Sequence, residues 1–262
     1  MQTEPETEAA LGPHHSPHVP LTAYYRDEAD HQRFLRRIFD ETASDYDRME
    51  RVMAMGTGAR YRRMALERAG LAPGDRVVDV GIGTGLLARE ACARIGPAGS
   101  LIGVDPSPGM LSHVALRGVQ LRVGRAEQLP CIDGEADFLS LGYAFRHVSD
   151  VARAFAEFHR VLRPGGKLLI LEISRPASAV GNALLKAYMR VVVPVIARLV
   201  ARERATSELW RYYWDTIEAC IPPAEILAAL EAAGFAAVRR HTELGIFSEY
   251  SAIKPRLVGS PG

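Results

Sequence analysis

Short hydrophobic runs and amphipathic stretches alternate along most of the chain. Apolar runs of strand length occupy residues 76–80, 100–104, 119–123, 136–141 and 167–173. Apolar residues at helical spacing follow three of these runs, up to about residue 95 and over 108–117 and 151–162. Strands that alternate with helices in this way predict an α/β fold, in which a parallel sheet carries helices on both faces.

Hydrophobic periodicity also predicts elements before and after this region. The first helix, over 31–42, has its apolar residues spaced from Phe34 to Phe39 and should end at the polar stretch 44–47. The other expected elements are a helix over 57–69, a helical insertion over 182–202 and 208–220, a helix over 222–233, and two paired strands over 235–241 and 245–254.

These elements predict one domain, residues 31–254, between a flexible N-terminal tail and a short C-terminal one. The expected divisions are the tail (1–30), N-terminal helices (31–70), a ligand-binding core (71–175), a helical lid (176–221), a C-terminal helix and strand pair (222–254), and the final tail (255–262).

Composition and charge exclude several classes of protein. The 262 residues are 48% hydrophobic and carry a net charge of +1, which gives no electrostatic argument for binding nucleic acid. The three cysteines are far apart and lack metal-ligand spacing, so we expect a reduced, cytoplasmic protein without disulfides or a metal site. His14, His15 and His18 could bind a metal adventitiously, but a solvated tail is the simpler explanation. We find no signal peptide and no uninterrupted apolar run long enough to span a membrane.

The loop after the first strand carries the clearest chemical signal. Residues 77–85 have the sequence VVDVGIGTG, with Asp79 near the end of a β-branched strand and Gly81, Gly83 and Gly85 before a helix. Glycines at such a turn let the backbone approach a ligand, and Asp79 could hold the loop or a cationic part of that ligand. A dinucleotide-binding loop has its third glycine one residue later, so this spacing favours a nucleoside without a pyrophosphate.

Asp105 ends the second strand, where a carboxylate can accept hydrogen bonds from both hydroxyls of a ribose. An acid at this place also suits NAD, so an NAD-binding oxidoreductase remains an alternative. Two further alternatives are a nucleoside-binding module without catalysis and a glycine loop that serves only a tight turn.

Six further motifs accompany the glycine loop. They are YDRM at 46–49, GVD at 103–105 with Met110, GRAEQLP at 124–130, FRHVSD at 145–150, RVLRPGG at 160–166 and LEISRP at 171–176. Together they resemble class I S-adenosylmethionine-dependent methyltransferases and, more narrowly, the UbiE-type family of quinone-ring C-methyltransferases, over about residues 34–254. The resemblance implies a Rossmann-like sheet of seven strands, the last one antiparallel, with N-terminal helices and a helical lid. It also implies that S-adenosylmethionine lies over the carboxyl ends of the first strands.

The resemblance assigns contacts to the cofactor residue by residue. Gly81, Gly83, Thr84 and Gly85 would contact the methionine part, Asp105 the ribose, Arg125 and Ala126 the edge of the adenine, and Gly142 the sulfonium side, with Asp79 and Met110 in the same set. This chain also departs from the family pattern. The family usually has Asn, Ser, His, Trp, Asn, Ser and Asn where this chain has Glu50, Ala54, Gly58, Tyr61, Arg125, Gly142 and His147.

The reaction that the resemblance implies is methyl transfer to a ring carbon of a quinol or phenol. Transfer to O or N of a natural product or another small molecule is the alternative. Ring C-methylation needs an electron-rich ring, which a base or a cation beside the phenol oxygen would supply. We consider Arg146 as the oxyanion stabiliser and His147 as the base. The alternatives are an ion pair of Arg146 with Asp150 or Glu172, and a loop role for His147.

The lid leaves two questions open. Its aromatic residues between Trp210 and Trp214 would either line a pocket for a flat substrate or pack between helices. The apolar and basic stretch 183–202 would either make weak peripheral contact with a membrane or form a buried lid helix, which Pro194 and the lack of a clean polar face favour. A homodimer is also compatible with the sequence.

Overall fold

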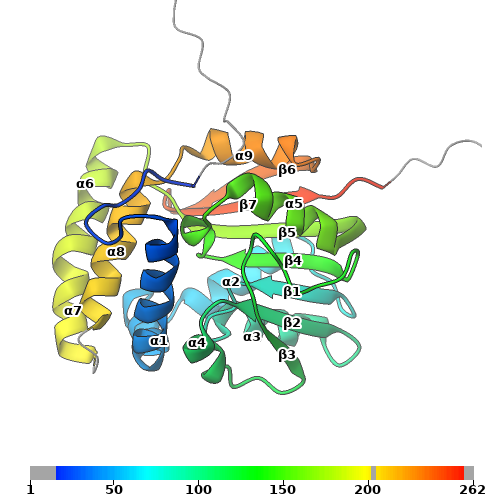
Figure 1. The fold of residues 1–262 in the computed structure, drawn as a ribbon, viewed down its shortest axis with the longest axis horizontal. Helices are drawn as coiled ribbons and strands as arrows, with labels where there is room; N and C mark the ends of the chain where they lie inside the picture. Colours follow the sequence, from blue (N-terminus) through cyan, green and yellow to red (C-terminus); the bar gives the residue numbers. More distant parts are fainter. Residues whose placement is uncertain (1–15, 202–204, 257–262) are drawn as a thin grey trace, which may run out of the picture.

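A seven-stranded sheet forms the centre of the structure, a computed structural model that describes residues 16–201 and 205–256 (Figure 1). The strands are β1 (Arg76–Val80), β2 (Ser100–Asp105), β3 (Val119–Val123), β4 (Ala136–Gly142), β5 (Leu162–Ile173), β6 (Ala236–Glu243) and β7 (Phe247–Ile253). Their order is β3-β2-β1-β4-β5-β7-β6, and β7 runs antiparallel to both of its neighbours. The predicted α/β sheet with an antiparallel last strand is confirmed.

Helices cover both faces of the sheet, as the alternation of strand-length apolar runs with helical spacing predicts. One face packs against α5 (Val151–Val161) and α9 (Pro223–Ala232), and the other against α2 (Gly58–Arg68) and α3 (Leu86–Ile95). The helix α4 (Pro108–Ser112) is shorter than the predicted helix over 108–117. It ends early because Val114 and Leu116 pack back onto the glycine loop, next to Gly85.

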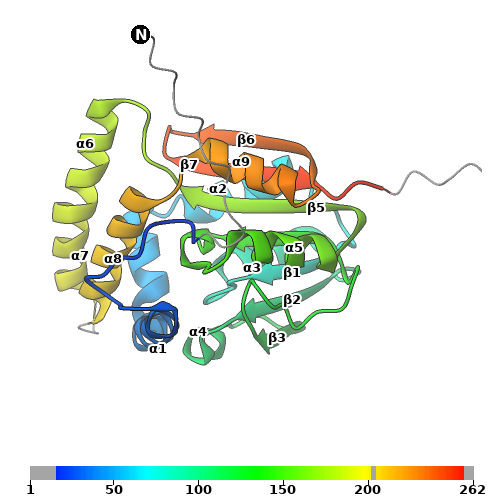
Figure 2. The same ribbon diagram turned by 45° about the horizontal axis from the view of Figure 1, so that its top comes forward.

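A third layer lies at the carboxyl ends of the parallel strands. It contains α1 (Glu28–Met53), α8 (Ala205–Ala219) and a continuous helix made of α6 (Ala179–Ala187), a π-helical turn η2 (Tyr188–Val192) and α7 (Val193–Val200). Figure 2 shows the continuous helix as the outermost element of this layer, with α8 beside it. Aromatic side chains, among them Phe34, Tyr212 and Trp214, form the core of the layer.

The predicted end of the first helix at 44–47 is wrong, because α1 continues to Met53. The polar residues of this stretch have partners elsewhere in the fold. The buried carboxylate of Asp45 accepts a hydrogen bond from Thr206 of α8 at 3.1 Å, and Asp47 accepts one from Thr84 of the glycine loop. These tertiary contacts outweigh a weak local preference against helix.

The prediction of a flexible tail over 1–30 is wrong for its second half. The backbone N–H of Ile221 donates to the carbonyl of Pro17 at 2.8 Å, and His18 forms a β-bridge with Cys220. His18 is buried rather than solvated, since this segment packs over α1 and the end of α8. The tail histidines at positions 14 and 15 lie outside the described residues.

The prediction of a buried lid helix is also wrong. In the continuous helix α6–η2–α7, the large apolar side chains of Val180, Leu184, Val191 and Leu199 are exposed. By length and composition, Ala179–Leu199 is the one segment in the described ranges that could cross a membrane, with a mean hydropathy of 1.4. Two cations of this apolar stretch, Lys186 and Arg190, pair with acidic residues of α8 while about half of each side chain stays exposed, and Arg198 is exposed.

Candidate active site

The glycine loop joins β1 to α3 and lies between two cavities. Gly81, Gly83 and Gly85 all have positive φ angles, of 62°, 56° and 88°, which residues with a side chain seldom adopt. Gly81 is the most constrained, because a Cβ there would lie 2.7 Å from the Cβ of Ala144. Since Gly81 lines both cavities, the loop connects them by its backbone alone.

The larger cavity measures about 530 Å³ and lies between α1 and the carboxyl ends of the strands. Its lining includes Arg36, Gly81, Gly124, Arg125, Ala126 and His147. The smaller cavity, of about 60 Å³, is lined by residues that include Tyr46, Arg62, Asp79, Gly83, Gly142 and Tyr143. The two cavities together offer an elongated site for a ligand with a bulky end and a narrow end.

Asp105 is held at the end of β2 by two backbone groups. Its carboxylate accepts hydrogen bonds from the N–H groups of Gly83 and Ser107, both at 2.9 Å. Burial raises the pKa of Asp105 to about 6. Asp105 is not among the described residues that line either cavity, but the next residue, Pro106, lines the larger one. Each carboxylate oxygen can accept more than one hydrogen bond, so the group keeps capacity for the hydroxyls of a ribose.

Asp79 is a buried carboxylate with one oxygen to spare. Its Oδ1 accepts a hydrogen bond from the Ser140 hydroxyl at 2.5 Å, whereas Oδ2 has no hydrogen-bond partner among the described residues. Burial raises the pKa of Asp79 to about 7. A buried acceptor without a partner, in the wall of the smaller cavity, is suited to a cationic group of a ligand.

The other predicted cofactor residues divide into two groups. Arg125, Ala126 and Gly142 line the cavities, and Arg125 donates to the Ser149 hydroxyl at 2.9 Å. Thr84 lines the smaller cavity, but its hydroxyl donates to Asp47 of α1 at 2.5 Å, so it also ties the loop to that helix.

Met110 and Gly85 are not among the described residues that line either cavity. Met110 is buried in α4, and its N–H donates to Ser107. Gly85 caps α3 and packs close to Leu116 and Val114. Both therefore support the loops around the site and do not face its cavities.

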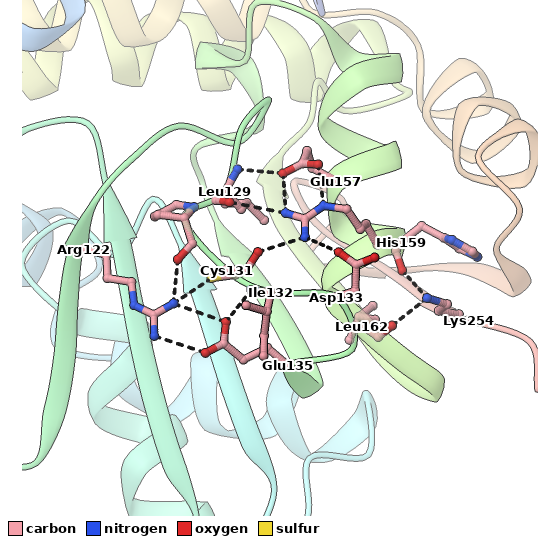
Figure 3. A network of polar contacts seen from close by, with 12 residues as sticks. Arg122, Leu129, Cys131, Ile132, Asp133, Glu135, Glu157, His159, Leu162 and Lys254 are labelled. Carbon is pink, nitrogen blue, oxygen red and sulfur yellow. Dashed lines mark hydrogen bonds and ion pairs between the residues drawn. The ribbon is translucent and has the colours of Figure 1, made fainter.

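A polar network holds the loop after β3 (Figure 3). Arg160 of α5 donates to the carbonyl of Leu129 at 3.3 Å and to that of Cys131 at 2.9 Å. Glu157 pairs with Arg160 and accepts the N–H of Leu129 at 2.8 Å. The motif that begins at Arg160 therefore fixes the end of the GRAEQLP motif.

Arg146 lies in a short 3-10 helix, η1 (Phe145–His147), after β4 and is completely buried. Its Nη1 donates to Glu172 of β5 at 2.5 Å, and the guanidinium lies over the Tyr213 ring at 5.0 Å. This ion pair is the alternative that the sequence left open. The guanidinium nevertheless keeps Nε and Nη2 without hydrogen-bond partners in the part of the chain that the structure describes.

His147 lies in an aromatic surround and lines the larger cavity. Its ring stacks on Tyr212, with 5.6 Å between centroids. The Tyr213 ring is tilted against it, and the Phe39 ring meets it edge to face. Burial, and then the nearby Arg146 charge, hold the pKa of His147 well below its usual value. A general base works best with a pKa near the working pH, so this environment disfavours His147 as the base.

Sequence reasoning overlooked Arg62 and Glu50 as parts of the site. Both line the smaller cavity and form an ion pair of 2.6 Å, and the Nε of Arg62 has no partner among described residues. It also missed a role for Glu172, which it named only as a partner of Arg146. The signal was a charged residue inside the apolar β5 run, where a hydrophobic one is the norm.

Comparison with known proteins gives one consistent result. Residues 26–254 match the model of the ubiE/COQ5 methyltransferase family. The chain is 30% identical to the ubiquinone/menaquinone biosynthesis C-methyltransferase UbiE of Hahella chejuensis, over 82% of this chain and 86% of that protein. It is 33% identical to a demethylmenaquinone methyltransferase of Mycobacterium sp. (strain KMS), over 83% of this chain and 93% of that protein. Among solved structures, a SAM-dependent methyltransferase from Thermotoga maritima has a TM-score of 0.59 at 23% identity, and the match covers 84% of this chain and 99% of that one.

Proposed function

Because the chain belongs to the ubiE/COQ5 methyltransferase family and is therefore an S-adenosylmethionine-dependent methyltransferase, we propose that it methylates a ring carbon of a quinol or a related phenol. One relative is named as a ubiquinone/menaquinone biosynthesis C-methyltransferase and another as a demethylmenaquinone methyltransferase, and these names motivate this class of acceptor. The family assignment replaces NAD, the alternative left by the sequence, with S-adenosylmethionine.

The residues of the two cavities fit S-adenosylmethionine. We assign the adenosine part to the larger cavity, with its ribose at the end of β2, where Asp105 precedes Pro106 of the cavity wall, and its adenine beside Ala126. The methionine part belongs in the smaller cavity, where Asp79 offers a free oxygen to a cation and Arg62 a free N–H to a carboxylate. When bound, this cofactor supplies a methyl group on a sulfonium, which is an electrophile without further activation.

The observation that supports ring C-methylation is the buried guanidinium of Arg146, whose Nε and Nη2 have no hydrogen-bond partner among the described residues. A cation held away from water stabilises the oxygen anion of a phenolate, and this makes the ring carbons beside it nucleophilic. His147 lines the larger cavity, and its lowered pKa argues against a part in proton transfer. O- or N-methylation of another small molecule is the competing proposal.

The test is a methyl-transfer assay with a panel of demethylated quinols and phenols, analysed by mass spectrometry for a gain of one methyl group. A C-methylated quinol can still be oxidised to a quinone, whereas an O-methylated one cannot. Product that gains a methyl and keeps the reversible oxidation supports ring C-methylation. Transfer to O, to N, or to no member of the panel contradicts it.

We further propose that the exposed face of the continuous helix touches a lipid surface, where acceptors with lipid tails reside. The exposed face carries the apolar side chains of Leu184, Val191 and Leu199. Its cations Lys186 and Arg190 are paired with Glu218 of α8, at 2.7 and 3.4 Å. Burial of such a face in the headgroup region is favourable in proportion to its apolar area.

Vesicle sedimentation tests this contact. The double variant Val191→Ser and Leu199→Ser should lose enrichment on vesicles, whereas Leu244→Ser, an 82% exposed residue at the β6–β7 turn, should keep it. Absence of enrichment for the unmodified protein would dismiss the proposal. A second copy of the chain is the alternative partner for this face. Light scattering would then detect a dimer, and the double variant would abolish it. A cytoplasmic location stays a prediction.

A further inference from the structure

A third cavity lies at the end of β5, where Glu172, the partner of Arg146, forms part of its wall. It measures about 210 Å³ and is lined by residues that include Glu172, Ser174, Ile217, Cys220, Ile226 and Tyr250. An engineered apolar cavity of about 150 Å³ is large enough to hold benzene. This cavity therefore has room for a single substituted aromatic ring.

Glu172 is the charged group in the wall of this cavity that keeps an open acceptor. Its Oε1 accepts hydrogen bonds from Arg146 at 2.5 Å and from the backbone N–H of Ile173 at 2.7 Å. Its Oε2 is buried and has no hydrogen-bond partner among residues 16–201 and 205–256. A buried carboxylate oxygen without a donor is costly, and a hydroxyl of a bound ligand would satisfy it.

We propose that this cavity receives the hydroxylated ring of the methyl acceptor and that Oε2 of Glu172 takes the proton of its hydroxyl. The inference rests on the proposed function, since it names the site and the base for that same reaction. The acceptor class is a benzenediol or phenol whose hydroxyl meets Glu172 while the ring lies among Ile217, Ile226 and Tyr250.

The cavity and the place of the methyl donor lie at the ends of two neighbouring strands, β5 and β4. Leu171, which precedes Glu172, pairs in the sheet with Gly142 of β4, and its carbonyl accepts the N–H of Tyr143 at 2.8 Å. Gly142 and Tyr143 line the smaller cofactor cavity. Neighbouring strands lie about 4.8 Å apart, so the two sites are at adjacent strand ends.

The proposed chemistry is balanced as follows. The hydroxyl proton moves to Glu172, and the phenolate charge is shared between Arg146 and the ring. A ring carbon then attacks the methyl group, the C–CH₃ bond forms, and the electron pair of the S–CH₃ bond stays on sulfur. The methylated carbon loses its hydrogen as a proton to solvent, and Glu172 returns its proton to the oxygen. The products are the methylated ring, the thioether and one proton.

The surroundings of Glu172 support proton uptake. Burial raises the pKa of Glu172 although Arg146 opposes this, which brings the carboxyl nearer to neutral pH than an exposed glutamate. The charged and titratable groups around it are Arg146 from η1, Tyr143 after β4, Arg175 after β5, Tyr213 and Cys220 from α8 and its end, and Tyr250 from β7. Burial raises the pKa of Cys220 to about 12, so that thiol stays protonated and does not compete as a base.

The decisive experiment compares Glu172→Gln with Glu231→Gln, an exposed carboxylate in α9. In Glu172→Gln we expect kcat for methylation of a demethylated quinol to fall by roughly 10²–10⁴-fold, the usual contribution of a general base. The pH profile of kcat should lose its rising limb, and calorimetry should show unchanged affinity for S-adenosylhomocysteine. Unchanged kcat in Glu172→Gln overturns the inference, and so does an equal loss in Glu231→Gln.

A second variant tests the cavity without altering the ion pair. Cys220→Phe places a ring in the cavity, so it should raise KM for the quinol and leave affinity for S-adenosylhomocysteine unchanged. An unchanged KM would overturn the placement of the ring. The failure of the proposed function has a different signature, because the unmodified enzyme would then transfer no methyl to any hydroxylated ring.

Discussion

Replacing Asp79 by Asn should weaken cofactor binding and at the same time stabilise the empty protein. The carboxylate is 1% exposed, one of its oxygens has no partner in the described structure, and its pKa is raised from 3.8 to about 7. A buried carboxylate charge with an unpartnered oxygen stabilises a bound cation, but its burial opposes folding of the ligand-free protein. Asn preserves the acceptor for the Ser140 hydroxyl and removes only the charge.

The size of the stability effect follows from the pKa. A rise from 3.8 to about 7 corresponds to about 4 kcal/mol at pH 8, where the group is ionised in both folded and unfolded chains. The new amide N–H₂ would be buried without a partner, at a cost of about 1–3 kcal/mol. We therefore expect Asp79→Asn to be more stable than the parent by about 1–3 kcal/mol at pH 8.

The sign of the pH dependence is determined by the direction of the pKa change. The folded state binds the proton of the Asp79 carboxyl more tightly than the unfolded state does. Asp79 is therefore most favourable to folding below pH 4, where it is protonated in both states, and it becomes less favourable as the pH rises to about 7. The advantage of Asp79→Asn should therefore be near zero at pH 5 and grow to its full value by pH 8. Urea unfolding of the cofactor-free proteins at these two pH values measures it.

Cofactor affinity should change in the opposite direction. Loss of a charge-assisted hydrogen bond to the α-ammonium group costs about 1.5–3 kcal/mol, or about 10–100-fold in Kd for S-adenosylhomocysteine. Affinity of the parent should improve as the pH rises through 7, and that of Asp79→Asn should not. A variant that binds as tightly as the parent at pH 8 would refute the assignment of Asp79 to the cation, whatever its stability.

Three other variants test separate parts of the site. Gly81→Ala should abolish cofactor binding in calorimetry, because the added Cβ would lie 2.7 Å from the Cβ of Ala144. The positive φ of residue 81 adds a cost of about 1–2 kcal/mol for alanine. A folded variant with normal cofactor affinity would contradict this reasoning. Arg160→Ala should lower the free energy of unfolding by about 1–3 kcal/mol, because the carbonyls of Leu129 and Cys131 lose their donor. It should also weaken the binding of adenosine. An unchanged midpoint in urea unfolding would contradict the role of this network. His147→Ala should keep the pH profile of kcat, and loss of one titration from the profile would restore His147 as the base.

Four of the five parallel strands could be predicted to within one residue because local signals agreed with tertiary packing there, whereas β5 begins at Leu162, five residues before its predicted range of 167–173. Arg76–Val80 and Val119–Val123 match the predicted ranges, since short β-branched runs are bounded by clear turns. The errors lie where long-range contacts decide. The continuation of α1 past Asp45 depends on Thr206, and the burial of His18 depends on a bridge to Cys220.

The candidate site likewise contains residues that local sequence reveals and residues whose role depends on long-range contacts. The glycine loop and Asp105 could be found from sequence because local backbone geometry gives them their role. Motif position alone could not show that Glu172 would combine a buried ion pair with a free oxygen. That combination depends on a partner 26 residues away and on a cavity formed by a third element.

Two departures from the family pattern, Glu50 and Gly58, are one structural feature. Glu50 accepts a hydrogen bond from Arg62 at 2.6 Å, and a Cβ at Gly58 would lie 2.2 Å from the same carboxylate oxygen. A side chain such as the usual histidine of the family would therefore displace the ion pair, so the two residues depend on each other. Glu50 and Arg62 line the smaller cofactor cavity, whereas neither is among the residues found around the β5 cavity. These departures concern the methionine end of the cofactor, and they carry no argument against a quinol as the methyl acceptor.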